Sequence, residues 1–216
     1  MQTVILANGA FPGPEKLLTI LDEAERIVCC DGAVNKLVDS GREPDVVIGD
    51  LDSVRPELKD RYADILIKIA DQDTNDLTKA VNWCVENGQK DIMILGATGR
   101  REDHAIGNIS LLADYSGRAN VKMLTDYGVF IAINKTTGFS SFPGQQVSVF
   151  SLCAQLELTS DGLKYPLKKM KLTSWWMGTL NEAVSDRFTI SFDGDGNVIV
   201  YMLDGKKALV DKGNYS

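Results

Sequence analysis

The sequence predicts an α/β protein: an N-terminal three-layer α/β domain with a mainly parallel sheet, followed by a C-terminal antiparallel β-sandwich domain. Three observations predict this fold class. Short apolar runs alternate with helix-like segments as far as about residue 124, later runs are short and often alternating, and turn-forming residues separate them. Buried strands that alternate with helices are typical of a parallel sheet covered on both faces. Short alternating strands with turn signals are typical of sandwiches or barrels.

Six apolar runs of the first half are the expected strands of the parallel sheet. They span residues 4–7, 27–30, 46–48, 65–69, 92–95 and 121–124. Polar or acidic stretches follow the first five: Asn8-Gly9, Asp31-Gly32, Gly49-Asp50-Leu51-Asp52-Ser53, residues 71–76 and Gly96-Ala97-Thr98-Gly99. In a parallel sheet these endings lie at one edge, where open α/β folds bind ligands. Acidic side chains gathered there repel one another unless a cation joins them, so the pattern indicates divalent-metal and phosphate chemistry.

Helical patterns fill the intervals between these runs. The clearest spans residues 74–87, where apolar residues recur at helical spacing and Gly88 supplies a stop signal. The other predicted helices carry the apolar sets Leu17, Leu18 and Leu21; Val34, Leu37 and Val38; and, over 103–115, Ile106, Ile109 and Leu112. We expect each set to face the sheet.

The second half predicts strands at residues 130–133, 146–152, 155–158, 187–192 and 198–202. The segment Asp193-Gly194-Asp195-Gly196-Asn197 predicts a hairpin that joins the last two. The change of pattern places the boundary near residues 126–128, which gives domains 1–127 and 128–216.

Composition excludes several classes of protein. The 216 residues carry a net charge of −7, which argues against a broad nucleic-acid surface but not against a small polyanion that arrives with Mg²⁺. No apolar run approaches the length of about 20 residues needed to cross a membrane, and the N-terminus shows no signal-peptide pattern. The four cysteines, Cys29, Cys30, Cys84 and Cys153, lack CxxC spacing, so we expect reduced core residues of a cytoplasmic protein.

Two acidic pairs are candidate metal ligands. Asp50 and Asp52 are alternate residues, so in an extended segment both face one cation, and Mg²⁺ prefers such oxygen ligands. Asp73 and Asp76 are three residues apart at a helix start and share a face. Helix capping by Asp52, Ser53, Asp73 or Asp76 is the simpler alternative, but it explains the number of acids poorly.

The segment from Gly96 to His104 is a candidate phosphate loop. Its glycines allow backbone N–H groups to approach phosphate oxygens, and the following helix N-terminus adds positive potential. Arg100 and Arg101 supply charge with the fork geometry that suits phosphate. A solvent-exposed turn is the alternative, and the lone histidine, His104, is more often structural than catalytic. Neither a P-loop nor a strand–GxGxxG–helix unit is present, which excludes a Walker-type kinase.

Aromatic residues of the second half are candidates for stacking on a flat cationic ring. Tyr165 lies in Gly162-Leu163-Lys164-Tyr165-Pro166-Leu167, and Trp175 and Trp176 follow in a loop-like stretch. A place in the sandwich core is the alternative for both tryptophans.

As an ordered set, these motifs resemble the thiamine pyrophosphokinase family over nearly the whole chain. The matching residues are Asn8-Gly9, Asp31-Gly32-Ala33, Gly49-Asp50-Leu51-Asp52-Ser53, Gln72-Asp73-Thr74-Asn75-Asp76 with Lys79-Ala80, Gly96-Ala97-Thr98-Gly99 with Arg101, Asp103, His104, Gly107 and Asn108, then residues 162–167 and Asn181-Glu182.

The resemblance implies transfer of the β,γ-pyrophosphoryl unit of ATP to thiamine with Mg²⁺, giving thiamine diphosphate and AMP. It implies a homodimer with active sites between subunits. The implied metal ligands are Asp50, Asp52 and Asp76. The implied catalytic residues are these three together with Asp73 and Arg101. Either Asp73 or Asp76 is the candidate base that takes the proton from the acceptor hydroxyl. The implied ATP-binding residues are Asn8, Asp31, Gly32, Gly96, Ala97, Thr98, Arg101, Asp103, His104 and Asn108. The implied thiamine-binding residues are Gln72, Asp73, Tyr165 and Asn181.

Three positions depart from the family pattern. Arg100 stands where glycine is common, Asn75 where threonine is common, and Leu180 where serine is usual. Because Leu180 directly precedes the predicted thiamine-binding residue Asn181, the resemblance supports the ATP half of the site better than the acceptor half. Two other functions remain open: a metal-dependent nucleotidyl- or glycosyltransferase that uses Asp50 and Asp52, and a nucleotide-binding sensor without turnover.

Overall fold

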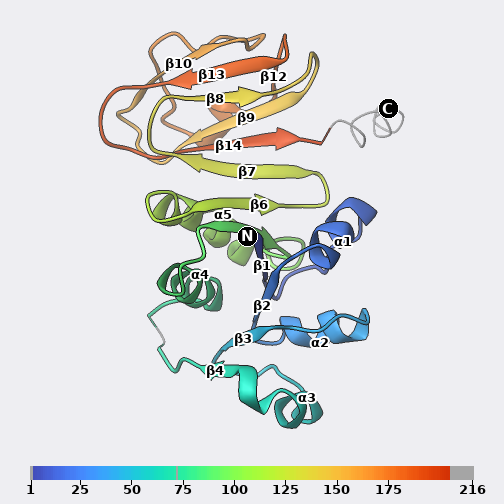
Figure 1. The fold of residues 1–216 in the computed structure, drawn as a ribbon. Coiled ribbons are helices and arrows are strands. Elements are labelled where there is room, and N and C mark those ends of the chain that lie inside the picture. The colour runs from blue at the N-terminus through green and yellow to red at the C-terminus, as the bar shows by residue number, and fades with distance from the viewer. Residues whose placement is uncertain (1, 72, 205–216) are drawn as a thin grey trace. The chain divides into compact units, whose positions relative to one another are not determined.

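The computed structural model describes residues 2–71 and 73–204, and its chain forms two compact units that meet in sequence between Asp126 and Tyr127. Figure 1 shows the elements of both. Among the residues so described, every helix is too short or too polar to cross a membrane.

The first unit is built on a six-stranded sheet in which every neighbouring pair is parallel. Its strands are β1 (Gln2–Leu6), β2 (Arg26–Cys30), β3 (Val46–Gly49), β4 (Leu66–Lys68), β5 (Asp91–Leu95) and β6 (Asn120–Leu124), in the spatial order β6-β5-β1-β2-β3-β4. The order reverses between β1 and β5. In open parallel sheets such a switch point opens a crevice at the carboxyl ends of the strands.

Helices cover both faces of this sheet, as the strand pattern predicts (Figure 1). They are α1 (Glu15–Asp22), α2 (Ala33–Asp39), α3 (Pro56–Arg61), the 3₁₀ turn Ala63–Ile65, α4 (Asp76–Glu86) and α5 (Glu102–Tyr115). Val4 and Leu6 of β1 share one apolar core with α1 and α2. On the other face α4 contacts β1, β2 and β3, and α5 contacts β6.

The prediction for the last of these helices is wrong in one respect. Ile106 is 53% exposed, although its spacing with Leu112 suggested a buried stripe. Burial along α5 is confined to its last turns, at Leu112, Ala113 and Tyr115. The first turns of α5 border a cavity that His104 and Asn108 line, so the sheet does not cover them.

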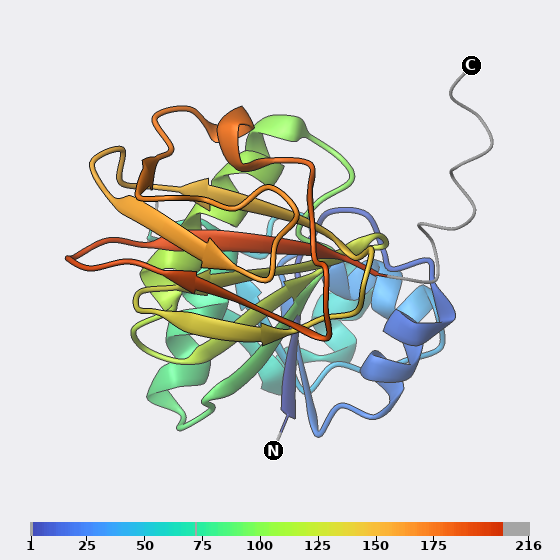
Figure 2. The ribbon, with the colours of Figure 1, turned by 90° about the horizontal axis from the view of Figure 1, so that it is seen from above.

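The second unit contains two antiparallel sheets, as predicted; its strands are coloured from yellow-green to red in Figure 2. One has the order β12-β9-β14-β7 and the other β11-β10-β13-β8. The strands are β7 (Gly128–Ile133), β8 (Thr137–Ser140), β9 (Gln146–Ser151), β10 (Glu157–Asp161), β11 (Met170–Lys171), β12 (Asn181–Glu182), β13 (Arg187–Ser191) and β14 (Val198–Leu203). Side chains from both sheets form one core, in which the Phe139 and Phe188 rings stack with centroids 4.9 Å apart.

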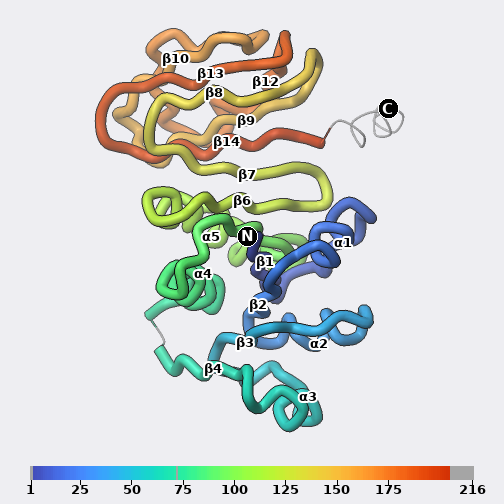
Figure 3. The backbone as a smooth tube through the Cα atoms, viewed as in Figure 1, coloured from blue at the N-terminus to red at the C-terminus, as the bar shows by residue number. Residues whose placement is uncertain are grey.

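The predicted hairpin between the last two strands is wrong. β13 pairs with β8 and β10, whereas β14 pairs with β7 and β9. The glycine- and aspartate-rich segment therefore connects the two sheets, as the chain trace from β13 to β14 shows (Figure 3). The glycines and aspartates of residues 193–197 predict a turn, but they do not identify the strand that becomes the hydrogen-bonded partner.

The cysteines differ in burial, which predicts their reactivity. All four are unpaired; Cys29, Cys30 and Cys84 are buried as expected, but Cys153 is only partly buried. Burial raises the pKa of the Cys84 thiol to about 12 and raises the pKa values of Cys29 and Cys30 as well. Because the thiolate is the reactive form, we expect iodoacetamide at neutral pH to modify Cys153 first and the other three slowly. Mass spectrometry of native and guanidinium-unfolded protein checks this, and modification of Cys29 at the rate of Cys153 would contradict it.

Candidate active site

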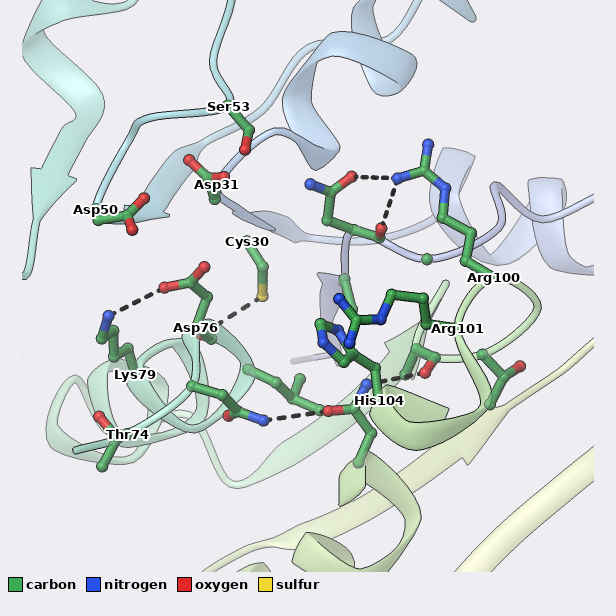
Figure 4. A pocket seen from close by; sticks show the side chains of 18 of the residues that line it. Cys30, Asp31, Asp50, Ser53, Thr74, Asp76, Lys79, Arg100, Arg101 and His104 are labelled. Atoms are coloured by element: carbon green, nitrogen blue, oxygen red, sulfur yellow. Dashed lines mark hydrogen bonds and ion pairs between the residues drawn. The ribbon is translucent and has the colours of Figure 1, made fainter. Parts of the chain in front are cut away.

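A cavity of about 500 Å³ lies at the carboxyl ends of the parallel strands of the first unit. Backbone hydrogen bonds join the loops that follow β1 and β5 at its floor: Gly9 N–H donates to the Gly96 carbonyl at 2.7 Å, and Ala10 N–H to that of Thr98 at 2.8 Å. The polar lining comprises Asn8, Asp31, Asp50, Asp52, Ser53, Asp71, Thr74, Asn75, Asp76, Lys79, Thr98, Arg100, Arg101, His104 and Asn108. Figure 4 shows carboxylates on one side and Arg101 and His104 on the other.

Three carboxylates converge in this cavity. Each of Asp31, Asp50 and Asp76 offers an oxygen atom that lies within 4.8 Å of those of the other two. Asp31 is buried, and its Oδ1 has no hydrogen-bond partner among the described residues. A buried anionic oxygen without a partner is costly, and three hard oxygen ligands suit a divalent cation such as Mg²⁺. The residues present therefore fit a metal ion.

The backbone after β2 and β3 positions two of these acids. Asp31 has a left-handed backbone conformation (φ 44°), and its N–H donates to the Ile48 carbonyl at 2.8 Å. Gly49, directly before Asp50, lies against it: a Cβ at Gly49 would be 2.9 Å from Asp31 Cβ. Only glycine permits this close approach, which brings the two strand endings together.

The third acid, Asp76, is the first residue of α4. The helix begins two residues later than predicted, because Asn75 caps it: the Asn75 side chain accepts from Thr78 N–H at 2.9 Å. The Lys79 ammonium group lies 3.1 Å from Asp76 Oδ1. Burial raises the pKa of Asp76, the Lys79 hydrogen bond and charge oppose that rise, and the charges of Asp31 and Asp50 add to it.

The expectation that Asp50 and Asp52 face one cation from an extended segment is not met. Leu51 between them has a left-handed conformation (φ 67°) and buries its side chain in the core. The segment is therefore a turn rather than an extended strand, and Asp52 N–H donates to Asp50 Oδ1 at 3.1 Å. Asp52 is exposed and lines the cavity, but the three-carboxylate group contains Asp31 in its place.

Asp73 also lies differently from its predicted place. It precedes α4, so it does not share a helix face with Asp76. Its side chain is exposed, its N–H donates to Asp71 Oδ1 at 2.9 Å, and it is not among the residues that line the cavity. The neighbouring Gln72 lies outside the described residues.

Basic residues border the opposite side of the cavity. Arg101 donates two hydrogen bonds to Asp103, at 3.1 and 2.6 Å, and this pairing, with the His104 N–H bond, lowers the pKa of Asp103 to about 2. Both side chains are largely exposed, so this is an exchangeable surface pair. An incoming phosphate can therefore replace Asp103 as the partner of Arg101. Asp103 itself does not line the cavity.

Two of the three departures from the family pattern lie at this cavity. Arg100 donates to the backbone oxygen of Asn8 at 3.0 Å and to its Oδ1 at 3.3 Å. Asn75 donates to Asn108, whose side chain donates in turn to the Ala97 carbonyl at 2.9 Å. Arg100 thus connects two loops, and Asn75 connects the start of α4 to α5. The predicted glycines also lie at close backbone contacts: a Cβ at Gly32 would be 2.8 Å from Ser53 Cβ, and one at Gly96 would be 2.7 Å from the Ala7 carbonyl oxygen.

Two of the four predicted thiamine-binding residues, Tyr165 and Asn181, lie together in the second unit. Buried Asn181 donates to the Tyr165 carbonyl at 2.7 Å and accepts from Tyr165 N–H at 3.1 Å, so it holds the backbone that carries the tyrosine ring. That ring is 62% exposed. Leu180, the third departure, has a left-handed conformation and is exposed. Trp175 and Trp176 are exposed too, which contradicts the core alternative.

Two roles were not predicted. The sequence suggested nucleotide contact for Asp31 but not its place among the three carboxylates, and it suggested no role for Lys79. The spacing of Asp76 and Lys79, three residues apart at a helix start, was a signal that could have identified the ion pair.

Comparison with known proteins shows the family of this chain. A family model described as the catalytic domain of thiamin pyrophosphokinase matches residues 17–124, and one described as the substrate-binding domain matches residues 128–201. The chain belongs to the thiamin pyrophosphokinase family. Thiamine pyrophosphokinase from Bacillus subtilis (strain 168) is 30% identical over 217 residues, which cover 89% of this chain and 94% of that protein.

Other members of the family match in part or in structure. Thiamine pyrophosphokinase 1 from rice (Oryza sativa subsp. japonica) is 35% identical over 153 residues, which cover 59% of this chain and 57% of the rice protein. The chain thus matches little more than half the length of that relative. The crystal structure of the Bacillus subtilis thiamine pyrophosphokinase superposes with a TM-score of 0.79 at 25% identity, covering 95% of this chain and all of that one.

Proposed function

We propose that this member of the family is a thiamine diphosphokinase that transfers the β,γ-pyrophosphoryl unit of ATP to the hydroxyl group of thiamine, giving thiamine diphosphate and AMP. The observation that carries the proposal is the cavity in which Asp31, Asp50 and Asp76 face Arg101 and His104. Carboxylates on one side and cationic donors on the other match a triphosphate that brings a divalent cation. Membership of the family supports the identity of the two substrates.

The reaction breaks one bond to phosphorus and makes another. The thiamine hydroxyl oxygen bonds to the β-phosphorus of ATP, the bond from that phosphorus to the bridging oxygen on the α side breaks, and AMP leaves. The hydroxyl proton passes to a base. Of the two candidate bases, Asp76 lines the cavity and Asp73 does not, so we assign this role to the oxygen atom of Asp76 that the metal ion leaves free.

The residues of the cavity have distinct parts in this proposal. Asp31, Asp50 and Asp76 would hold Mg²⁺, which supplies charge neutralisation of the triphosphate when bound. Arg101 binds the transferred group and stabilises its developing charge. The loops of Asn8, Gly96 and Thr98 present backbone groups to the phosphates, and His104 contacts them from the start of α5. We also propose that the metal ion is Mg²⁺, that the protein forms a homodimer and that it works in the cytoplasm.

One assay separates this function from its alternatives. Purified protein is incubated with Mg²⁺, thiamine and ATP labelled at the γ-phosphate, and the products are separated by ion-exchange chromatography. We expect AMP and labelled thiamine diphosphate in equal amounts. Labelled free pyrophosphate with AMP attached to the acceptor would indicate a nucleotidyltransferase instead, and binding of ATP without products would indicate a sensor.

A change at Tyr165 tests the acceptor half. Stacking of an aromatic ring on a cationic ring contributes about 0.5–2 kcal/mol, so Tyr165→Ala is expected to raise the KM for thiamine about two- to thirtyfold. The KM for ATP should stay within about twofold, because Tyr165 is not among the lining residues of the cavity. Tyr165→Phe retains the ring and should behave like the wild type. Equal rises of both KM values in Tyr165→Ala would exclude the stacking role.

A further inference from the structure

A buried positive charge lies beside the three carboxylates. Lys79 is 5% exposed, lies on the first turn of α4 and lines the cavity. Its Nζ lies 3.1 Å from Asp76 Oδ1, as the dashed line in Figure 4 shows. A buried ammonium group is costly without an anion beside it. The ion pair therefore stabilises the charged forms of both Lys79 and Asp76.

The presence of this ammonium group changes what the carboxylates can bind. A divalent cation that approaches Asp31, Asp50 and Asp76 is attracted by three negative charges and repelled by Lys79 at short range. The cation and Lys79 also compete for the oxygen atoms of Asp76. A metal ion that takes Asp76 therefore weakens the ion pair on which buried Lys79 depends.

A nucleotide removes this conflict. Its phosphate oxygens carry negative charge into the same cavity, and the flexible four-carbon stem of lysine lets the ammonium group turn towards a new anion. Phosphate then compensates Lys79 while the metal ion takes Asp76. Metal and nucleotide each improve the site for the other, which is a positive coupling between two ligands.

We propose that Lys79 is the residue that couples metal binding to nucleotide binding. Its ammonium group holds Asp76 when the cavity contains no nucleotide, and it contacts a phosphate oxygen when the metal–nucleotide complex is bound. Free divalent cation consequently binds weakly, and the metal enters together with the nucleotide. This inference rests on the proposed function, because it takes a metal-bound nucleotide as the ligand of the cavity.

The test measures two affinities of the full chain that change in opposite directions. Free Mn²⁺ binding is measured by electron paramagnetic resonance, and binding of a non-hydrolysable ATP analogue in the presence of EDTA is measured by calorimetry. In Lys79→Met we expect Mn²⁺ alone to bind about tenfold more tightly, because the competing charge is lost. The analogue alone should bind about tenfold more weakly, because the positive charge that offsets the three carboxylates is lost and they repel the phosphates more strongly. Damage to the fold would weaken both affinities.

Control variants make the result specific. Lys79→Arg keeps the charge, so it should restore weak Mn²⁺ binding and most of the analogue affinity. Lys90→Met removes one positive charge at an exposed site next to the amino end of β5, away from the cavity, and should change neither affinity. Circular dichroism checks the fold, and Lys79→Gln replaces Lys79→Met if the latter does not fold.

The outcomes also separate this inference from the proposed function. Unchanged or weaker Mn²⁺ binding in a folded Lys79→Met variant would overturn the role of Lys79 and leave the metal site intact. If the wild type binds no Mn²⁺ even with the analogue present, the metal site of the proposed function is wrong and the inference fails with it.

Discussion

Asp50→Asn is expected to lower the rate of thiamine diphosphate formation by about a thousandfold. Asparagine keeps the size of the side chain but removes the charge from one of three convergent carboxylates. A metal ion contributes several kcal/mol of charge stabilisation in the transition state, and about 4 kcal/mol corresponds to a thousandfold in rate. The measurement is steady-state production of AMP at saturating ATP and thiamine, over a range of Mg²⁺ concentrations.

The neighbouring acids provide matched controls for Asp50→Asn. Asp31→Asn should show a loss of similar size, whereas Asp52→Asn and Asp73→Asn should lose about 100-fold at most, because neither belongs to the convergent group. Mn²⁺ binding in the presence of the ATP analogue should fall in the same order. Equal losses in Asp50→Asn and Asp73→Asn would show that the three carboxylates do not act as a unit.

Gly9→Val is expected to cost about 3 kcal/mol in the free energy of unfolding or to prevent folding. A Cβ atom at Gly9 would lie 2.3 Å from the Gly96 carbonyl oxygen and 2.6 Å from that of Thr98. Both neighbours are backbone atoms of the loop that follows β5, so no side chain can rotate to make room. The two loops must separate, which breaks the Gly9 N–H bond to Gly96 and opens the floor of the cavity.

Urea unfolding followed by circular dichroism checks this prediction. Gly107→Val is the matched control, because a Cβ at Gly107 in α5 would have no neighbour within 4 Å. The control should change stability by about 0.5 kcal/mol or less. A Gly9→Val variant as stable as the wild type would show that the loops do not contact each other as closely as the structure has them.

The fold class could be predicted because it depends on periodicity. Apolar runs that end in polar residues, separated by helical spacing such as that of Leu77, Ala80 and Val81, identify a parallel sheet with covered faces. The same argument placed Asn8, Asp31 and Asp50 at one edge of the sheet, and there the structure has all three lining one cavity. These predictions needed only the alternation of strands and helices along the chain.

The errors concern interactions that local patterns do not encode. Residues 193–197 were predicted to be a hairpin turn, but β13 and β14 pair with strands of different sheets, and that pairing depends on contacts far apart in the chain. Ile106 has helical spacing, yet it is 53% exposed, because spacing along the chain does not show what packs against each turn of a helix. Partial burial of Cys153 likewise depends on its surroundings rather than on its own run of residues.

By itself, the sequence determined the fold class, the family and the sheet edge at which the acidic residues gather, because these depend on residue type and spacing. Only the tertiary structure decided which acids meet. The left-handed backbone at Leu51 interrupts the extended segment expected to carry Asp50 and Asp52, close packing of Gly49 against Asp31 brings a different carboxylate into the group, and the fold buries Lys79 beside Asp76. Side-chain direction follows from backbone torsion and packing, and both are settled only when the whole chain is folded.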